Sequence, residues 1–144
     1  MNIIIRKAQN KDFDAICKLM QNELGYPNLN IKEALKRLEF FQNNENHETF
    51  IAENNDEIIG FIGIMKDVAY NCDGYYAQII ALAVLKKAQG QGIGTKLVKQ
   101  AETWSLENRI NNIVVNSGLH RLNTHKFYEK NGYEKKSYSF SKGL

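Results

Sequence analysis

Residues 75–98 read YYAQIIALAVLKKAQGQGIGTKLV, and the order of elements in this segment indicates the fold class. Residues 75–85 are almost wholly apolar and contain several β-branched and aromatic side chains, which predicts a long and largely buried strand. A glycine-rich loop follows at residues 89–94. Ile93 and Leu97 then begin a series of apolar residues at helical spacing. A buried strand that leads through a glycine loop into a helix is typical of an α/β chain.

The loop between this strand and helix predicts an anion site. The first backbone N–H groups of a helix lack internal partners and carry a partial positive charge. Glycines allow the chain to curl these amides inward, and they let a ligand approach without a Cβ in the way. The expected ligand is a phosphate or pyrophosphate, and the alternative is a tight turn that only packs the helix on the strand. A P-loop is excluded because Gly-Lys-Ser/Thr is absent. The dinucleotide-binding fingerprint is also incomplete.

The pattern outside this stretch predicts a mixed α/β chain with the element order β α α β β β α β α β. The hairpin signal Asn54-Asn55-Asp56 separates two predicted strands, and Asn30 is a candidate N-cap for the second helix. Strand-helix-strand units near the C-terminal end favour a partly parallel sheet. The predicted elements are strand 3–5, helices after Asn10 and Asn30, strands 48–53, 57–66 and 75–85, a helix from 93, strand 113–115, helix 120–130 and strand 133–140.

Length and composition predict one cytoplasmic domain that spans residues 1–144. The chain has 144 residues and one proline, with no repeat and no linker-like segment. Its N-terminal apolar run has only three residues, too few for a signal peptide, and no segment approaches the roughly 20 apolar residues of a membrane span. Cys17 and Cys72 lack metal-ligand spacing, so we expect reduced thiols, no metal site and no membrane contact.

The charges of the chain are unevenly distributed. Residues 1–85 contain 8 Lys or Arg and 12 Asp or Glu, a net charge of −4. Residues 86–144 contain 11 and 4, a net charge of +7. The basic part suits an anionic ligand and the acidic part a cationic one, although solvated surface charge explains the same numbers. Nucleic acid is not an expected partner, because basic residues are not interleaved with aromatic ones.

Two separated motifs resemble those of the GCN5-related N-acetyltransferase (GNAT) superfamily. The first is the strand Leu82-Ala83-Val84 followed by Gln89-x-x-Gly92-x-Gly94, and the second is Phe127-Tyr128-Glu129-Lys130-Asn131-Gly132-Tyr133. The element order matches as well, so the resemblance covers nearly the whole chain. It implies a central mixed sheet of about six to seven strands with about four flanking helices. It further implies an enzyme that moves the acetyl group of acetyl-CoA to a primary amine, and it allows a homodimer.

The resemblance also implies roles for individual residues. Tyr128 would be the general acid that protonates the leaving thiolate and would contact the coenzyme, and Arg121 would reach a phosphate where many relatives carry an Asn. The strand end, Leu82, Ala83 and Val84, would pair through its backbone with the pantetheine arm. The residues that would hold the pyrophosphate are Gln89, Gly90, Gln91, Gly92, Ile93, Gly94 and Thr95.

The general base and the acceptor pocket are less specified by the sequence. Asn116 stands where some relatives have a Glu that can serve as the general base. An amide cannot take a proton, so Glu23 is the candidate base. Glu23, Tyr26 and Tyr76 are the candidate acceptor-binding residues, and their acidic and aromatic side chains suit a cationic amine. Two rival interpretations remain at this point: a non-catalytic module that binds or senses acyl-CoA, and a basic nucleic-acid-binding domain formed by residues 86–144.

Overall fold

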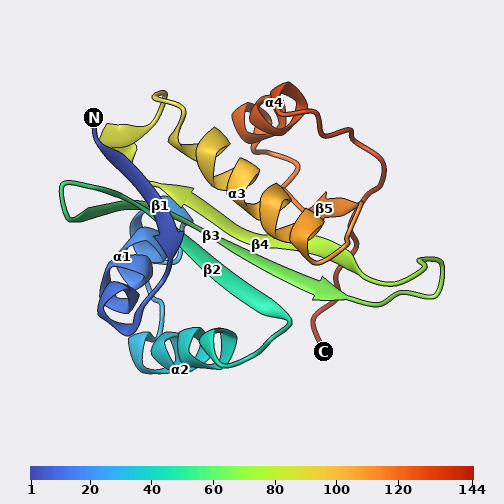
Figure 1. Ribbon diagram of the computed structural model, residues 1–144, viewed down its shortest axis with the longest axis horizontal. Helices are drawn as coiled ribbons and strands as arrows, with labels where there is room; N and C mark the ends of the chain where they lie inside the picture. Colours follow the sequence, from blue (N-terminus) through green and yellow to red (C-terminus); the bar gives the residue numbers. More distant parts are fainter. The chain divides into compact units, whose positions relative to one another are not determined.

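A five-stranded sheet with the order β1-β2-β3-β4-β5 organises the first part of the computed structural model, which describes residues 1–144 (Figure 1). The chain divides into two units, Met1–Val114 and Val115–Leu144, and each is described by itself. Neighbouring strands from β1 to β4 are antiparallel. The strands are β1 (Ile3–Lys7), β2 (His47–Asn54), β3 (Glu57–Asp67), β4 (Tyr76–Val84) and β5 (Ile113–Val115).

The predicted hairpin between β2 and β3 is confirmed. Asn55 and Asp56 have φ angles of 49° and 68°, the left-handed conformation that both central residues of a type I′ turn require. Asn and Asp tolerate this conformation better than other non-glycine residues. The turn sets Asn54 opposite Glu57 and so fixes the register of the β2–β3 pair.

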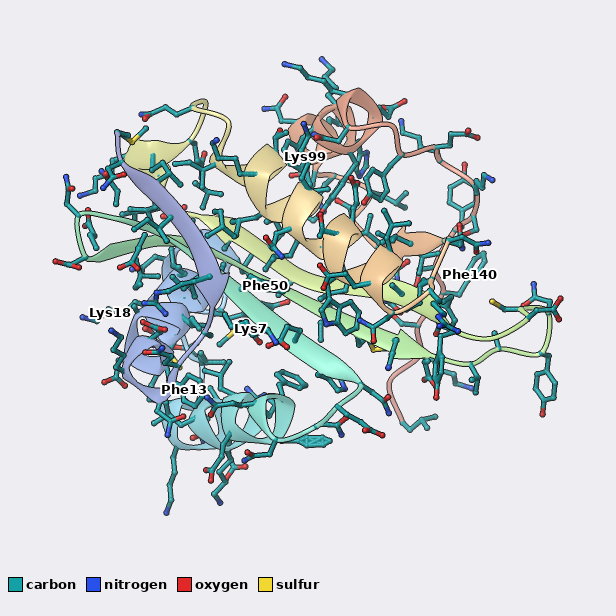
Figure 2. All side chains as sticks on the ribbon, viewed as in Figure 1. Lys7, Phe13, Lys18, Phe50, Lys99 and Phe140 are labelled. Carbon is teal, nitrogen blue, oxygen red and sulfur yellow. The ribbon has the colours of Figure 1, made fainter.

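Two helices from the N-terminal region cover one face of the sheet (Figure 1). Helix α1 (Phe13–Glu23) follows a short 3₁₀ turn, η1 (Asn10–Asp12), and α2 (Ile31–Gln42) begins after Asn30. The Asn30 side chain accepts a hydrogen bond from the Glu33 amide at 3.2 Å, which confirms the predicted N-cap. The buried residues that these helices and the strands place in one cluster include Phe13, Ile16, Leu19, Leu38, Ile51 and Phe61. Phe13 and Phe50 are labelled in Figure 2.

Helix α3 (Ile93–Glu107) packs on the opposite face, as the alternation of side chains along β3 requires. Phe61 belongs to the cluster under α1, and a Cβ on its neighbour Gly60 would lie 3.2 Å from the Leu97 side chain of α3. The same Cβ would lie 3.0 Å from the Ala83 carbonyl oxygen. The absence of a side chain at Gly60 therefore allows Leu97 of α3 to pack directly against the strand.

The second unit contains one helix, α4 (Leu122–Lys130), which ends at Asn131 and Gly132 as predicted. Gly132 has a φ of 91°, the left-handed conformation common just after a helix. The predicted strand at 133–140 is wrong, because these residues form no regular secondary structure. Their side chains are exposed apart from the half-buried Tyr133, so the alternating pattern has no surface to pack against.

The sheet therefore has five strands, and the expectation of six to seven is wrong, whereas the mixed α/β class and the four α-helices are confirmed. The element order is also as predicted up to α4. No helix of the chain combines the length and the apolar character needed to cross a membrane.

Candidate functional site

The glycine-rich loop connects β4 to α3 and has the conformation that its sequence predicts. A short 3₁₀ turn, η2 (Lys86–Ala88), follows β4, and the loop then leads into α3 at Ile93. Gly90 and Gly92 have φ angles of 76° and 82°, a region that L-residues rarely adopt. A Cβ added to either glycine would meet no atom within 4 Å. The two glycines are thus needed for backbone conformation, and the space beside them is open.

The N-terminus of α3 is left without a protein cap. Its N-cap residue is Gly92, which has no side chain to accept from the first amides, and the first turn contains no acidic residue. The Gly92 carbonyl accepts the first helical bond, from the Lys96 amide at 3.1 Å. The amides before Lys96 therefore have no helical acceptor and form a positive site. Phosphate oxygens fit this site, so the loop has the chemistry to hold the pyrophosphate of acetyl-CoA.

Four exposed lysines lie on η2 and on the first two turns of α3. Lys87 forms an ion pair with Glu57 at 2.9 Å, and Lys99, labelled in Figure 2, lies on α3. Together with Lys86 and Lys96 they give the surface around the loop a positive potential. Such a potential attracts a polyanionic ligand.

The end of β4 has one backbone edge that no neighbouring strand covers. Strand β5 has only three residues, and its pairing starts near the beginning of β4, where the Ala77 amide donates to the Asn112 carbonyl at 3.0 Å. Such a short strand cannot extend to Leu82 and Val84. The Leu85 amide donates to Ile59 of β3 at 2.7 Å, so alternation directs the backbone groups of Leu82 and Val84 away from β3. Their edge is open to an extended ligand.

A hydrogen-bonded cluster joins this strand end, the loop and the end of α1. The Gln89 Nε2 atom donates to the Val84 carbonyl at 2.9 Å and to Glu23 Oε2 at 3.4 Å. The other oxygen of Glu23, Oε1, accepts from the Lys86 backbone amide at 3.3 Å. Gln89 thus braces the loop against the strand end and α1. No local feature of the sequence predicts the Lys86 contact, because 63 residues separate the partners.

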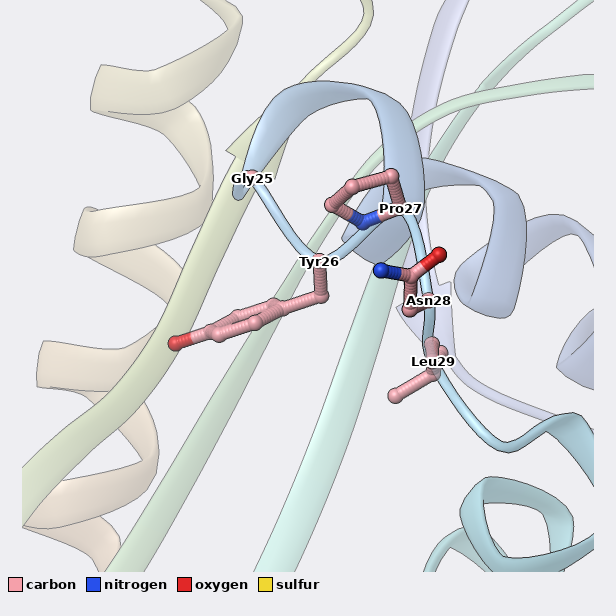
Figure 3. Close-up of a pocket in the computed structure, with 5 residues that line it drawn as sticks. All are labelled: Gly25, Tyr26, Pro27, Asn28 and Leu29. Atoms are coloured by element: carbon pink, nitrogen blue, oxygen red, sulfur yellow. The ribbon is translucent and has the colours of Figure 1, made fainter.

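The candidate acceptor residues lie apart from one another. Gly25, Tyr26, Pro27, Asn28 and Leu29 line an open hollow of about 320 Å³ in the segment after α1, and Figure 3 shows the Tyr26 ring projecting from this segment. Tyr76 begins β4, eight residues before Val84. At a rise of about 3.3 Å per residue it lies about 26 Å from the strand end, to which Glu23 is linked through Gln89. A small molecule beside Glu23 therefore does not reach Tyr76.

Tyr128 is buried within the second unit, at the end of α4. Its side chain is 8% exposed, and its ring makes edge contacts with Phe127 and Tyr133 at centroid distances of 5.2 Å and 5.6 Å. Burial raises the pKa of Tyr128 to about 12, and the positive charge of Arg121 opposes this shift. The phenol therefore stays protonated over the whole physiological range, so it can serve as an acid but not as a base.

The other polar residues of the second unit are less suited to proton transfer. Arg121 is exposed and immediately precedes α4. His125 Nε2 lies 2.7 Å from the Gly118 carbonyl oxygen, so this nitrogen carries the proton and is engaged in a structural hydrogen bond. Asn116 is exposed, and its amide remains unable to serve as a base.

Comparisons with known proteins agree with the two motifs. The profile of the Acetyltransferase (GNAT) family matches residues 13–133. The chain belongs to this family. It is 27% identical to the aminoalkylphosphonate N-acetyltransferase of Salmonella typhimurium over 97% of this chain and 90% of that protein. A GNAT family acetyltransferase from Staphylococcus aureus is 29% identical and superposes with a TM-score of 0.82 over 100% of both chains.

A third comparison concerns the fold alone. The aminoglycoside acetyltransferase AAC(6′)-Iy, solved with a bisubstrate analogue that contains CoA, is 16% identical to this chain. It superposes with a TM-score of 0.88 over 100% of this chain and 99% of that one. Family membership and the named relatives make this GNAT protein an acetyl-CoA-dependent acetyltransferase.

Proposed function

We propose that this acetyltransferase moves the acetyl group of acetyl-CoA to the primary amine of a small, cationic acceptor. The observation that carries the proposal is the loop Gln89–Thr95, with two left-handed glycines facing open space and an uncapped helix terminus. In this proposal the amides from Gln91 to Thr95 hold the pyrophosphate, and Arg121 adds positive charge to the phosphates. We further propose that the two units act as one domain, since the family match spans both.

The backbone at the end of β4 takes the pantetheine arm in this proposal. The Val84 carbonyl already accepts from Gln89, so its capacity for a second bond is reduced. Leu82 therefore supplies the principal backbone donor and acceptor on the open edge, and Ala83 contributes through its pairing with β3. Strand-like pairing of this kind suits a ligand with amide groups.

Tyr128 is the proposed general acid. Acetyl-CoA supplies a thioester, and the attack of the neutral amine forms a carbon–nitrogen bond as the carbon–sulfur bond breaks. The Tyr128 hydroxyl donates its proton to the departing sulfur. The attacking nitrogen loses a proton to solvent, and solvent then reprotonates Tyr128. The buried phenol, with its pKa of about 12, is fully protonated at neutral pH and so is ready to donate.

The acceptor is proposed to bind at the segment after α1. Tyr26 offers an exposed aromatic face, and residues 1–85 carry a net charge of −4, both favourable to an ammonium group before it loses its proton. Tyr76 remains a candidate contact only for a long acceptor. The name of the Salmonella relative supports a small amine as the acceptor.

A thiol-release assay tests the proposal. Purified protein with acetyl-CoA is challenged with aminoalkylphosphonates, polyamines, aminoglycosides, amino acids and an N-terminal peptide, and free CoA thiol is measured. We expect release that depends on one of the small amines, with acetylated product confirmed by mass spectrometry. Turnover of the peptide alone would overturn the proposed acceptor class. Binding of the coenzyme without turnover of any amine would favour the sensor interpretation.

A further inference from the structure

The carboxylate of Glu23 lies close to a loop that is proposed to bind an anion. By charge alone, Glu23 should repel the phosphates of a coenzyme bound there. Both of its oxygens nevertheless face the loop region, at 3.3 Å from the Lys86 amide and 3.4 Å from Gln89 Nε2. Each carboxylate oxygen thus has one of its lone pairs engaged by the protein, a contact that a general base does not need.

The two contacts join elements that are far apart in the sequence. Glu23 is the last residue of α1, Lys86 begins η2, and Gln89 begins the glycine loop. The Gln89 amide completes the link by donating to Val84, the last residue of β4. One side chain from α1 thus restrains the turn, the loop and, through Gln89, the strand end.

The loop offers little else to hold its shape. Gly90 and Gly92 are in left-handed conformations with no neighbouring atoms around their Cβ positions, and no side chain caps α3. A free glycine-rich segment samples many backbone conformations, and a ligand that needs one of them loses affinity in proportion. A brace that restricts Gln89 and Lys86 therefore favours the conformation in which the amides converge.

We propose that Glu23 is a positioning residue, which acts through Gln89 and the Lys86 amide to pre-organise the phosphate loop for acetyl-CoA. This inference rests on the proposed function, because it assigns Glu23 a part in holding the coenzyme. Glu23 also lies two residues before the Gly25–Leu29 segment, so the brace connects the proposed acceptor side with the coenzyme side of the enzyme.

The direction in which Glu23→Ala changes the Kd for CoA tests the inference. Repulsion alone predicts that Glu23→Ala binds CoA more tightly, because a negative charge leaves the vicinity of the phosphates. Bracing predicts weaker binding in spite of that lost charge. Since both hydrogen bonds of Glu23 are long, we expect Kd for CoA to rise only about 3–10-fold by calorimetry.

Glu57→Ala is the matched control. Glu57 pairs with Lys87 on the same short turn, so its removal also takes a carboxylate from beside the loop but leaves the brace intact. We expect its Kd for CoA to stay the same or fall slightly. A similar rise in both variants would overturn the inference, because it would mean that any acidic residue near η2 has this effect.

Two further readouts separate positioning from a structural or catalytic role. Glu23→Ala should raise KM for acetyl-CoA and leave kcat within about twofold, whereas loss of a base would lower kcat. In a Gln89→Ala background, Glu23→Ala should lose a large part of its effect. Additive effects, an unchanged or lower Kd, or a loss confined to kcat would each overturn the inference. Failure of the wild-type protein to bind CoA would instead contradict the proposed function.

Discussion

At the scale of single residues, the proposed chemistry depends on Tyr128 remaining protonated. Its ring contacts the rings of Phe127 and Tyr133, and burial of the side chain is the cause of its raised pKa. A phenol with a pKa of about 12 is a weaker acid than a thiol, which ordinarily has a pKa of about 8.5. It therefore acts by donating to the sulfur only as negative charge develops there, which is the general-acid role.

Tyr128→Phe should lower kcat at pH 7.5 by about 10²-fold, within the range that a positioned acid contributes. KM for acetyl-CoA should change little, because the ring and its contacts with Phe127 and Tyr133 are kept. The measurement is steady-state thiol release. A variant that retains more than about half of the wild-type kcat would rule out the general-acid role.

The same pKa makes a prediction for the pH profile of the wild-type enzyme. Because the folded-state pKa of Tyr128 is about 12, its acid form is complete below pH 10, and kcat should rise as the amine loses its proton and then stay level. A decline of kcat between pH 8 and 10 would contradict this assignment. The same shift makes folding less favourable above the usual phenol pKa of 10, since the unfolded state ionises first.

Gly92→Ala tests the loop at the residue scale. A Cβ at a φ of 82° costs about 1 kcal/mol in backbone strain without any clash, and it points into space that the phosphates are proposed to use. We expect Gly92→Ala to lose about 1 kcal/mol of stability and to raise the Kd for CoA at least tenfold. Gly74→Ala, at a φ of 75° and equally open, should lose similar stability and bind CoA normally. Equal CoA binding by the two variants would refute the assignment of the loop.

At the scale of elements, local sequence predicted the parts whose signals are local. The Asn55-Asp56 turn, the Asn30 cap and the glycine loop all depend on residues within a few positions of one another. The failed strand at 133–140 shows the limit, because a strand also needs a partner and a surface to cover. The brace from Glu23 to Gln89 could not be predicted for a related reason, since 66 residues separate the two and only the packing of α1 brings them together.

A second long-range link, centred on Arg6, was also missed from the sequence. Arg6 of β1 forms two hydrogen bonds with Asp12 of η1, at 2.8 Å and 3.0 Å, and its Nε donates to Glu53 of β2 at 2.8 Å. Asp12 is 2% exposed and also accepts from the Gln9 amide. The cluster therefore fixes the entry into α1 against the first two strands.

Asp12→Ala should destabilise the fold by about 3 kcal/mol, because it leaves Arg6 and the Gln9 amide without their principal acceptor. The measurement is urea unfolding, with Glu33→Ala as the control. Glu33 pairs with Lys36 on the exposed face of α2, so its loss should cost less than about 0.5 kcal/mol. Equal losses in the two variants would contradict a special role for the cluster.

Acid should weaken the same cluster. Burial alone would raise the pKa of Asp12, but the hydrogen bonds from Arg6 and Gln9 outweigh it and lower the pKa below its usual value of 3.8. A carboxyl whose pKa is lower in the folded state than in the unfolded state stabilises the fold at pH values above the unfolded pKa. This stabilisation is lost as the pH falls through the folded pKa. The wild-type protein should therefore lose stability below about pH 4 more steeply than Asp12→Ala does.

For the whole molecule, the position of the glycine-rich loop gives the uneven charge distribution a functional interpretation. The excess of +7 over residues 86–144 includes the lysines of η2 and α3, which lie beside the uncapped helix terminus. The net charge of −4 belongs to residues 1–85, which include Glu23 and the segment that contains Tyr26. The two parts of the chain thus carry opposite net charges, which suits an anionic coenzyme and the cationic amine that we propose as the acceptor.

This arrangement predicts that KM for acetyl-CoA depends on salt concentration. KM for acetyl-CoA should rise several-fold between about 50 mM and 500 mM NaCl, because added salt screens exposed charges over distances of a few ångströms. Lys96→Gln combined with Lys99→Gln should flatten this dependence, since both lysines lie on the first turns of α3. Lys18→Gln, which removes an exposed lysine from α1, should leave the slope unchanged. A slope that is unaffected by the α3 pair, or reduced equally by Lys18→Gln, would mean that the potential around the loop does not guide the coenzyme.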